Sequence, residues 1–306
     1  MQKIIQSGDL RRKPLQNRYT GLFYVLPWVI GFLIFQLYPF VMSLYYSFTN
    51  YNMIKAPVWV GLNNYIRIFT KDKYFFNSIR VTLLYVLMAV PMKLAFALLI
   101  AMVLNMKLRG INFFRTVYYL PSILGGSVAV SVMWRFLFAK NGMINQLLAI
   151  LGISGPAWLG DPHWALFTVS LLTVWQFGSS MVIFLAGLKQ IPAELYEAAA
   201  VDGISKVGTF IKITLPMISS IIFFNLIMQM VNAFQEFTGV FVITSGGPMY
   251  STYLYGMMLY ENAFSNFKMG YASALSWILF VIILAFTALT FKSSSYWTYY
   301  EDGGDF

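Results

Sequence analysis

Six long apolar segments, separated by shorter polar ones, dominate the chain. Each is long enough to cross a bilayer, because a spanning helix needs roughly 20 mainly apolar residues. None shows the short alternating segments of a β-barrel, so helices are expected. The sequence therefore predicts an all-α integral membrane protein with six transmembrane helices, at about residues 22–48, 81–106, 114–138, 165–188, 217–244 and 269–291.

The longest inner connection, residues 189–216, carries the signals of two short helices. Pro192 suits the first turn of a helix from Ala193 to about Val201, and Gly203 can stop that helix by adopting a positive φ. A second helix is expected from near Ser205 toward Pro216. Together they would form a helical elbow that lies across the membrane surface.

The outer connections predict less regular structure. Residues 63–69 are amphipathic and are expected to form a short interfacial helix. Residues 142–151 predict a weak helix that Gly152 ends, and residues 245–248 (Ser-Gly-Gly-Pro) predict a reversal of the chain.

Composition agrees with a membrane protein. Hydrophobic residues make up 59% of the 306 and charged residues 10%, which is too little polar surface to cover a soluble globule. Because the chain has no cysteine, disulfides, thiol catalysis and cysteine metal sites are excluded. The net charge of +10 is scattered along membrane flanks rather than gathered on one soluble face, so no nucleic-acid partner is expected.

The distribution of lysine and arginine residues indicates the orientation of the chain in the membrane only weakly. Arg11, Arg12, Lys13 and Arg18 precede the first apolar run, as in a signal peptide, but the run is too long and no small-residue cleavage site follows, which favours a retained first span. With the N-terminus inside, inner segments hold 12 Lys/Arg and outer segments eight. Tails at residues 1–21 and 292–306 are then expected in the cytoplasm.

The elbow also carries a spaced motif. Glu197-Ala198-Ala199 is followed after three residues by Gly203, and after nine more by Ile213-x-Leu215-Pro216. This spacing resembles the signature loop of the membrane subunits of ATP-binding-cassette (ABC) importers. The alternative is an ordinary amphipathic connector in which the alanines only pack and Gly203 only caps a helix, and the continuation to Pro216 weighs against it.

Further markers resemble the carbohydrate-uptake branch of that family, in the manner of the first permease subunit of maltose-type and glycerol-phosphate-type importers. They are residues 60–65 (Val-Gly-Leu-Asn-Asn-Tyr), 134–138 with Gly142 and Asn145, 244–252 around Gly246-Gly247-Pro248, and 260–264. The resemblance departs from the maltose version, whose equivalent is longer, with extra N-terminal spans and a large outer domain. The resemblance implies a type I ABC importer permease fold in the cell (cytoplasmic) membrane, crossing it several times within residues 22–291.

The resemblance also implies partners. These are a second homologous permease, a cytoplasmic ATPase dimer that binds ATP and magnesium, and an extracytoplasmic solute-binding protein that delivers sugar. The chain has no G-x-x-x-x-G-K-[ST] phosphate loop, so it is not expected to be an enzyme or to hold a cofactor itself. The residues implied in ATPase coupling are Glu197, Ala198, Ala199, Asp202, Gly203, Ile213, Leu215 and Pro216.

Polar side chains within spans are candidates for the sugar site, because burying them in lipid is otherwise costly. Gln229, Asn232 and Glu236 recur at helical spacing and are expected to share a face. In relatives, the sugar-contacting region falls near residues 233–236. The full candidate set is Gln229, Asn232, Gln235, Glu236, Trp175, Gln176, Ser180 and Lys93. The alternative is that these groups bridge helices within the complex.

Lys93 is the one cation in the middle of a predicted span. An ionisable group at that depth suggests a function. Two hypotheses stay open: Lys93 pairs with Glu236, or it meets an acidic sugar such as a uronate. Substrate identity, including oligosaccharide length, stays open as well.

Two other classes of membrane protein are less consistent with the sequence. A secondary transporter would favour broken helices and carboxylates within the membrane, whereas the acids here lie outside the predicted spans, Glu236 excepted. A membrane enzyme would need paired carboxylates, a His/Asp set or a metal cluster. The single histidine, His163, follows Asp161-Pro162 and is expected to be solvated or to cap a turn.

Overall fold

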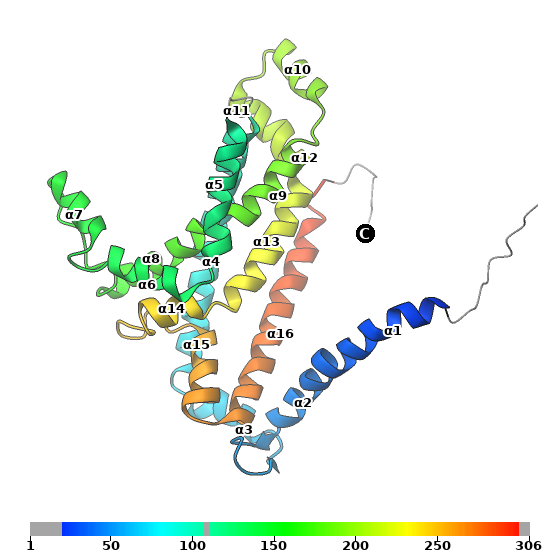
Figure 1. The fold of residues 1–306 in the computed structure, drawn as a ribbon, viewed down its shortest axis with the longest axis vertical. Coiled ribbons are helices and arrows are strands. Elements are labelled where there is room, and N and C mark those ends of the chain that lie inside the picture. The colour runs from blue at the N-terminus through cyan, green and yellow to red at the C-terminus, as the bar shows by residue number, and fades with distance from the viewer. Residues whose placement is uncertain (1–19, 107–109, 300–306) are drawn as a thin grey trace, which may run out of the picture.

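The computed structural model describes residues 20–106 and 110–299. Most of the predicted N-terminal tail, Lys107 to Arg109 and the end of the C-terminal tail lie outside the described residues. Helices α4 (Phe75–Asn105), α13 (Ser219–Phe234) and α16 (Met269–Ser294) run along the molecule. The elbow helix α10 (Ala193–Val201) lies at one end, and α3 (Asn63–Lys71) at the other (Figure 1).

The first apolar segment forms a helix of which only the second half packs against the rest of the described fold. It comprises α1 (Thr20–Phe32), a π-helical turn η1 (Leu33–Leu37) and α2 (Tyr38–Ser47). α2 packs against α16, where the indole N–H of Trp277 donates to Ser43 Oγ at 3.2 Å. α1 projects away from the other helices (Figure 1), and 0% of the most apolar 18-residue window between Phe23 and Ser47 is buried. In the bilayer this helix must be covered by lipid or by another protein.

The core forms around α4. This helix contacts α8 (Pro162–Trp175), α9 (Gly178–Leu188) and α13. Small side chains on α4 allow these neighbours to approach closely, because membrane helices associate by tight packing rather than by expelling water. Ala89, Ala97 and Ala101 are fully buried. Gly178 serves the same purpose between α9 and α5 (Ile111–Leu124), since a Cβ there would lie 2.8 Å from the Tyr118 carbonyl oxygen.

Three predicted spans are not single straight helices. α5 meets α6 (Val128–Leu137) at 101°, and α8 meets α9 at 49°. The helix of residues 206–217 meets α13 at 68°, and the predicted span 217–244 breaks again at residues 235–237, before α14 (Thr238–Ile243). Among the described residues, three helices are long and apolar enough to cross a membrane alone, and up to six spans result if each bent pair crosses once.

Local hydrogen bonds explain two of these breaks. Ser127, after Gly125-Gly126, accepts the Val130 N–H at 3.3 Å and so begins α6. Glu236 Oε1 accepts the Gly239 N–H at 2.9 Å near the start of α14. Such side chains compete with continued backbone bonding, and apolar periodicity gives no sign of that competition. The spans expected over 114–138, 165–188 and 217–244 are therefore each interrupted by a bend, and the prediction of six spans holds if each bent pair crosses once.

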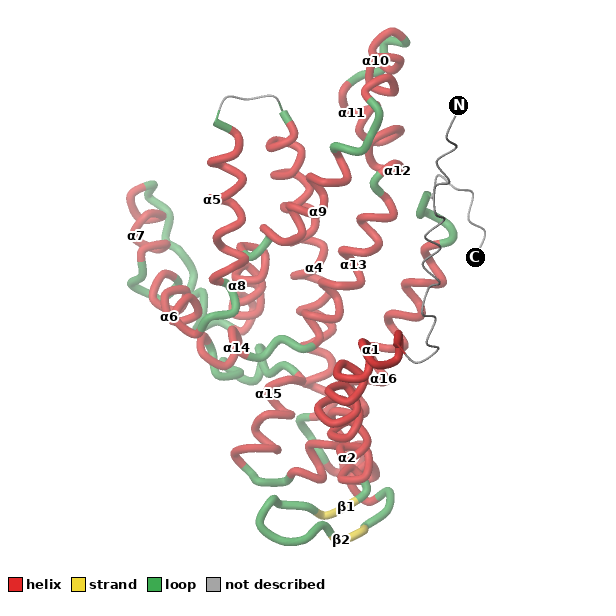
Figure 2. The backbone as a smooth tube through the Cα atoms, turned by 45° about the vertical axis from the view of Figure 1, so that its right-hand side comes forward, coloured by secondary structure: helices red, strands yellow, loops and turns green. Residues whose placement is uncertain are grey.

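The remaining elements lie in the connections. The helices expected at 63–69 and 142–151 are confirmed as α3 and α7 (Met143–Ile150), and Gly152 has a φ of 75°. The sequence missed strands β1 (Thr49–Asn50) and β2 (Val58–Trp59), an antiparallel pair with Thr49 opposite Trp59 (Figure 2). It also missed the short helix α15 (Tyr255–Tyr260) and the π-helical turn η3 (Glu261–Ser265) that precede α16.

Candidate functional site

The elbow has the local structure that the sequence predicts. α10 spans Ala193–Val201, and Gly203 has a φ of 70°. The chain then enters α11 (Lys206–Thr209), a π-helical turn η2 (Phe210–Thr214) and α12 (Leu215–Met217). Ser205 Oγ accepts the Gly208 N–H at 3.2 Å and so caps this second helix. The predicted helix-turn-helix is confirmed.

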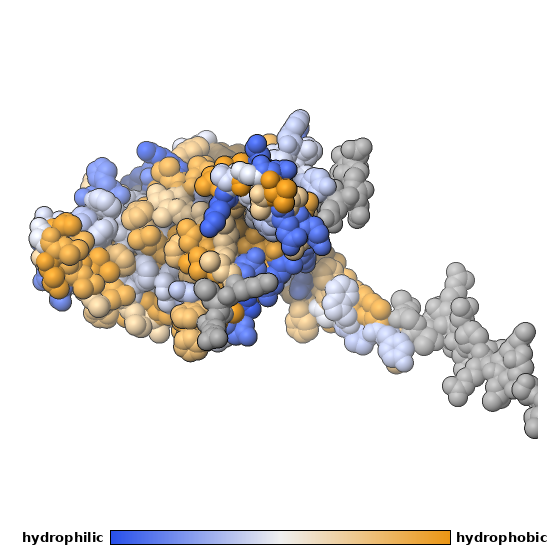
Figure 3. Space-filling view, turned by 90° about the horizontal axis from the view of Figure 1, so that it is seen from above, coloured by the Kyte–Doolittle hydropathy of each residue, from blue (hydrophilic) through white to orange (hydrophobic). Residues whose placement is uncertain are grey.

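The outer surface of the elbow mixes acidic and apolar side chains. Glu197 and Asp202 are exposed. Val201 is 88% exposed, Val207 68% and Ile211 55%. Hydrophilic residues gather around this end, while hydrophobic residues cover much of the flanks (Figure 3). Exposed apolar residues rimmed by polar ones are typical of a surface that binds another protein.

The motif residues divide into two sets. Ala198, Leu215 and Pro216 are exposed together with Glu197, Asp202 and Gly203, whereas Ala199 is buried and Ile213 is half-buried. Of the three consecutive alanines, Ala198 and Ala200 are exposed, and Ala199 packs inward.

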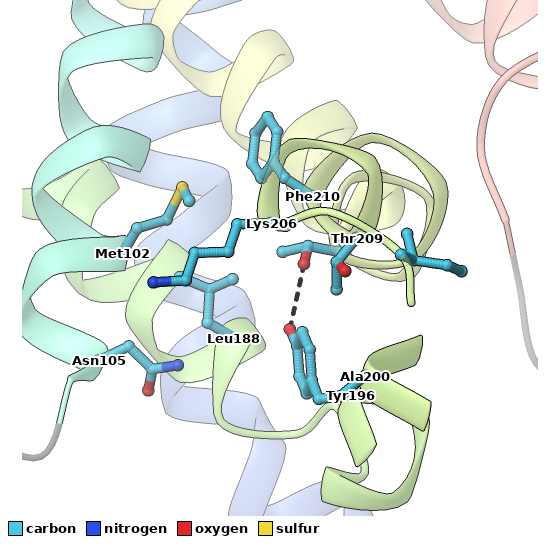
Figure 4. Close-up of a pocket in the computed structure, with 10 residues that line it drawn as sticks. Met102, Asn105, Leu188, Tyr196, Ala200, Lys206, Thr209 and Phe210 are labelled. Atoms are coloured by element: carbon cyan, nitrogen blue, oxygen red, sulfur yellow. Dashed lines mark hydrogen bonds between the residues drawn. The ribbon is translucent and has the colours of Figure 1, made fainter. Parts of the chain in front are cut away.

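A cavity of about 380 Å³ separates the elbow from the long helices. It lies between the ends of α4 and α9 and the two arms of the elbow (Figure 4). The Tyr196 hydroxyl and Thr214 Oγ1, 3.2 Å apart, join α10 to the second arm across it. The remaining lining residues include Met102, Asn105, Leu188, Lys206 and Phe210. Because the elbow is not solidly packed against the spans, this hydrogen bond is expected to restrain it.

We expect Tyr196→Phe to loosen the elbow without unfolding the protein. A neutral hydrogen bond contributes about 0.5–1.5 kcal/mol, so amide exchange across residues 193–204 should accelerate about two- to tenfold. Thr214→Val should reproduce the effect. Thr209→Val removes a hydroxyl that bonds only within its own helix, to the Ser205 carbonyl at 3.1 Å, and should leave exchange in α10 unchanged. Equal exchange rates in all four proteins would contradict the restraint.

A second cavity, of about 310 Å³, lies where three helix breaks converge. Its lining includes Gly125-Gly126 from the α5–α6 break, Gln176 from the α8–α9 break, and residues 235–237 from the α13–α14 break. Non-helical backbone at membrane depth is tolerated where it is buried in protein or lines a water-filled cavity. The arrangement therefore has the form of a site or path through the membrane domain. We call it the central cavity.

Hydrogen bonds of Gln176 connect the α8–α9 break to the α5–α6 break. Its Nε2 donates to the Gly125 carbonyl at 2.7 Å, and the Ser122 hydroxyl donates to the Gln176 carbonyl at 3.1 Å. Ser122 Oγ also accepts the Ser179 N–H at 3.0 Å. A Cβ on Gly125 would collide with the Gln176 side chain, so glycine is required for this contact.

Polar groups line the cavity on its other sides. The Tyr85 hydroxyl lies 2.6 Å from Thr173 Oγ1, which joins α4 to α8. Glu236 is half-buried and bonds the Gly239 N–H through one carboxylate oxygen. Gln235 is exposed. The amide and carboxylate groups can hydrogen-bond to a hydroxyl-rich ring, and the aromatic rings of Tyr85 and Phe237 can stack against it.

The structure brings together only part of the predicted site. Gln176, Gln235 and Glu236 line the central cavity. The expected common face of Gln229, Asn232 and Glu236 is wrong, because α13 ends at Phe234, and Gln229 is buried whereas Asn232 is exposed. Candidates outside the lining are Gln229, Asn232, Trp175, Ser180 and Lys93.

Lys93 is buried on α4, with 7% of its surface exposed. Within residues 20–106 and 110–299 no ion pair joins it to Glu236 within 4.0 Å, so the first of the two hypotheses, direct pairing, does not hold in this conformation. Tyr85, Thr173 and Ser131 also line the central cavity and are not among the residues that the sequence predicts. Single tyrosine, threonine and serine residues in an apolar run give no signal by which to select them.

His163 is solvated, which is one of the two states expected for it, and the side chain that caps α8 is that of Asp161. Asp161 Oδ1 accepts the His163 N–H at 2.9 Å and lies 3.0 Å from Nδ1 of the 91% exposed ring. The backbone hydrogen bond lowers the pKa of Asp161 below its usual value. Across the described part of the chain, no group of three or more His, Asp or Glu residues could hold a metal ion.

Comparison with known proteins gives consistent matches. Residues 70–294 match the model of the family described as "Binding-protein-dependent transport system inner membrane component". The chain is 49% identical over 289 residues to the probable ABC transporter permease protein YesP of Bacillus subtilis, covering 94% of each chain. It is 32% identical over 287 residues to the multiple sugar-binding transport system permease protein MsmF of Streptococcus mutans, covering 92% of this chain and 97% of that protein.

Solved structures match the fold. A chain of a bacterial alginate ABC transporter, in complex with an alginate pentasaccharide-bound periplasmic protein, matches with a TM-score of 0.77 and 22% identity. The match covers 90% of this chain and 94% of that one. At this identity the likeness concerns the fold alone.

Proposed function

The chain belongs to the binding-protein-dependent transport system inner membrane component family, and on this premise we propose that it imports a carbohydrate through its central cavity. It is an ABC transporter permease subunit, and it has the all-α fold of an ABC importer permease. In the proposal, an extracytoplasmic solute-binding protein delivers the sugar. The observation that carries it is the convergence of three helix breaks on a polar cavity in a chain of this family.

The substrate class is supported by the relatives and by the lining. MsmF belongs to a multiple sugar-binding transport system and LacF of Rhizobium radiobacter, 31% identical, to a lactose transport system. In this chain Gln176, Gln235 and Glu236 offer hydrogen-bonding groups, and Tyr85 and Phe237 offer rings. We place Trp175, Ser180, Gln229, Asn232 and Lys93 along the path rather than in the cavity lining of this conformation.

The proposed ATPase contact is the outer surface of the elbow. Glu197, Ala198, Asp202 and Gly203 lie on it beside exposed apolar side chains. Separate ATPase subunits, which bind ATP and magnesium themselves, would contact this surface. Closure of the ATPase dimer would then move α10. Orientation follows from this role: the elbow end and both chain termini lie in the cytoplasm.

A second permease is proposed to cover part of the exposed apolar surface. The strongest support is α1, where most residues from Phe23 to Phe32 are exposed and none is buried. Two related permeases would also supply two elbows to an ATPase dimer. Broken helices, which the sequence analysis took as favouring a secondary transporter, occur in this fold as well, so the family match decides between the two classes.

The proposal is tested by purifying the chain from native membranes in mild detergent. A second permease and an ATPase should copurify, and the complex should hydrolyse ATP faster when a sugar-loaded solute-binding protein is added. A chain recovered alone that still transports sugar in liposomes without ATP would overturn the proposal and favour a secondary transporter.

A further inference from the structure

A cationic cavity of about 180 Å³ lies at the end of the molecule opposite the elbow, beside α3 (Figure 1). Arg67, Lys71, Lys73 and Lys268 line it, and Asp72 is the single carboxylate in the lining. The cations come from two segments of the chain, before α4 and before α16. The fold therefore gathers four positive side chains around one hollow.

The carboxylate of Asp72 already accepts hydrogen bonds from two uncharged donors. Oδ2 of Asp72 accepts the Tyr271 hydroxyl at 2.6 Å, and Oδ1 accepts the Tyr74 N–H at 2.9 Å. No cation lies within 4.0 Å of Asp72 among the described residues. Glu261, the other carboxylate near this end, accepts the Tyr253 hydroxyl at 2.6 Å and does not line the cavity. An anion from outside the chain is thus attracted to the hollow.

Aromatic rings hold two of the cations at the rim. The Arg67 guanidinium carbon lies 5.6 Å from the centre of the Tyr271 ring, and Lys73 Nζ lies 5.2 Å from the centre of the Tyr74 ring. Cation–π contacts of this length position a charge without neutralising it.

The depth of the cavity identifies the kind of anion. Lys268 directly precedes α16, and Lys73 lies two residues before α4, both of which are long and apolar enough to cross a membrane alone. If both helices span the bilayer, the cavity is expected at the height of the lipid headgroups, where aromatic and basic residues anchor spanning helices.

An apolar stripe runs beside the cavity. Leu62, the N-cap residue of α3, is 61% exposed, Ile66 and Phe69 on α3 are 56% and 51% exposed, and Phe76 at the start of α4 is 61% exposed. Leu62, Ile66 and Phe69 are spaced by four and three residues and so lie on one face of α3 and its N-cap. A short helix with an exposed apolar face and basic neighbours is typical of an element that lies in the membrane interface.

We propose that the cationic cavity binds the phosphate of an anionic phospholipid headgroup, with the acyl chains of that lipid against the α3 stripe. Inorganic phosphate offers the same charge without the chains. An acidic protein surface would satisfy the cations but would leave the stripe uncovered at headgroup depth, so the lipid fits both features.

The proposal is tested with the full chain and its copurifying subunits in nanodiscs that contain equal amounts of phosphatidylglycerol and phosphatidylcholine. Native mass spectrometry after release counts the retained lipids. We expect the wild type to favour phosphatidylglycerol, and the double variant Arg67→Gln/Lys268→Gln to lose about threefold or more of that preference. The charge-conserving pair Arg67→Lys/Lys268→Arg should retain it.

A matched control is Lys55→Gln/Arg80→Gln, which removes one lysine and one arginine that are exposed but outside the cavity. An equal loss in both double variants would mean general surface attraction and would overturn the site. Full displacement of the lipid by inorganic phosphate would also overturn the proposed lipid site. If Arg67→Gln/Lys268→Gln retained lipid as the wild type does but no longer bound an acidic protein, that protein, and not the lipid, would be the ligand of the cavity.

Discussion

Gly203→Val is expected to reduce ATP-driven uptake about five- to thirtyfold while leaving the membrane domain folded. The φ of Gly203 is 70°, in the left-handed region, and a Cβ there would meet nothing within 4 Å. Valine therefore introduces backbone strain and no collision. That strain costs about 1–2 kcal/mol, which corresponds to the stated change in the population of the native elbow. Uptake and ATPase activity are measured together in proteoliposomes.

Gly203→Asn is the matched control, because asparagine adopts left-handed φ far more readily than valine does. It adds polar bulk at the same exposed position and should retain most of the uptake. If both variants lost uptake equally, uptake would depend on the surface contact that residue 203 makes and not on its dihedral angle. If both transported as the wild type does, the elbow would not depend on this turn.

The elbow could be predicted in detail because its signals are local. Proline before a helix and glycine after it act on the dihedral angles of their own residues, so no knowledge of the rest of the fold is needed. The structure confirms α10 and the positive φ of Gly203. The cavity behind the elbow could not be predicted, because the Tyr196–Thr214 contact joins residues 18 positions apart across a turn of unknown angle.

The central cavity was predicted only in part, for a physical reason. Hydropathy reports that a segment is buried in lipid or protein, but it does not report where Gly125-Gly126 or Glu236 interrupts a helix. The helix breaks then change which side chains share a face, so Gln229 and Glu236 separate. Tyr85 and Thr173, 88 positions apart, meet through helix packing that one sequence does not encode in any local pattern.

Glu236→Leu is expected to give the largest loss of uptake among substitutions in the central cavity, about tenfold to hundredfold. In the proposed function its carboxylate hydrogen-bonds sugar hydroxyls, and hydrogen bonds to charged groups contribute about 1.5–3 kcal/mol. Glu236→Gln keeps an oxygen that can accept both the Gly239 N–H and a hydroxyl, so its loss should stay below about tenfold. Uptake is measured with labelled saccharides that the wild-type transporter imports.

The two variants also separate transport from local structure. Glu236 Oε1 bonds the Gly239 N–H near the start of α14, and leucine removes that acceptor whereas glutamine preserves it. Loss of the bond alone would lower thermal stability and leave the uptake of the surviving protein normal. A direct contact with sugar instead predicts low uptake per assembled complex and intact ATPase activity without substrate. Normal uptake by purified, assembled Glu236→Leu would confine this residue to holding α14 in place, and the sugar contacts would then have to come from Gln176 and Gln235.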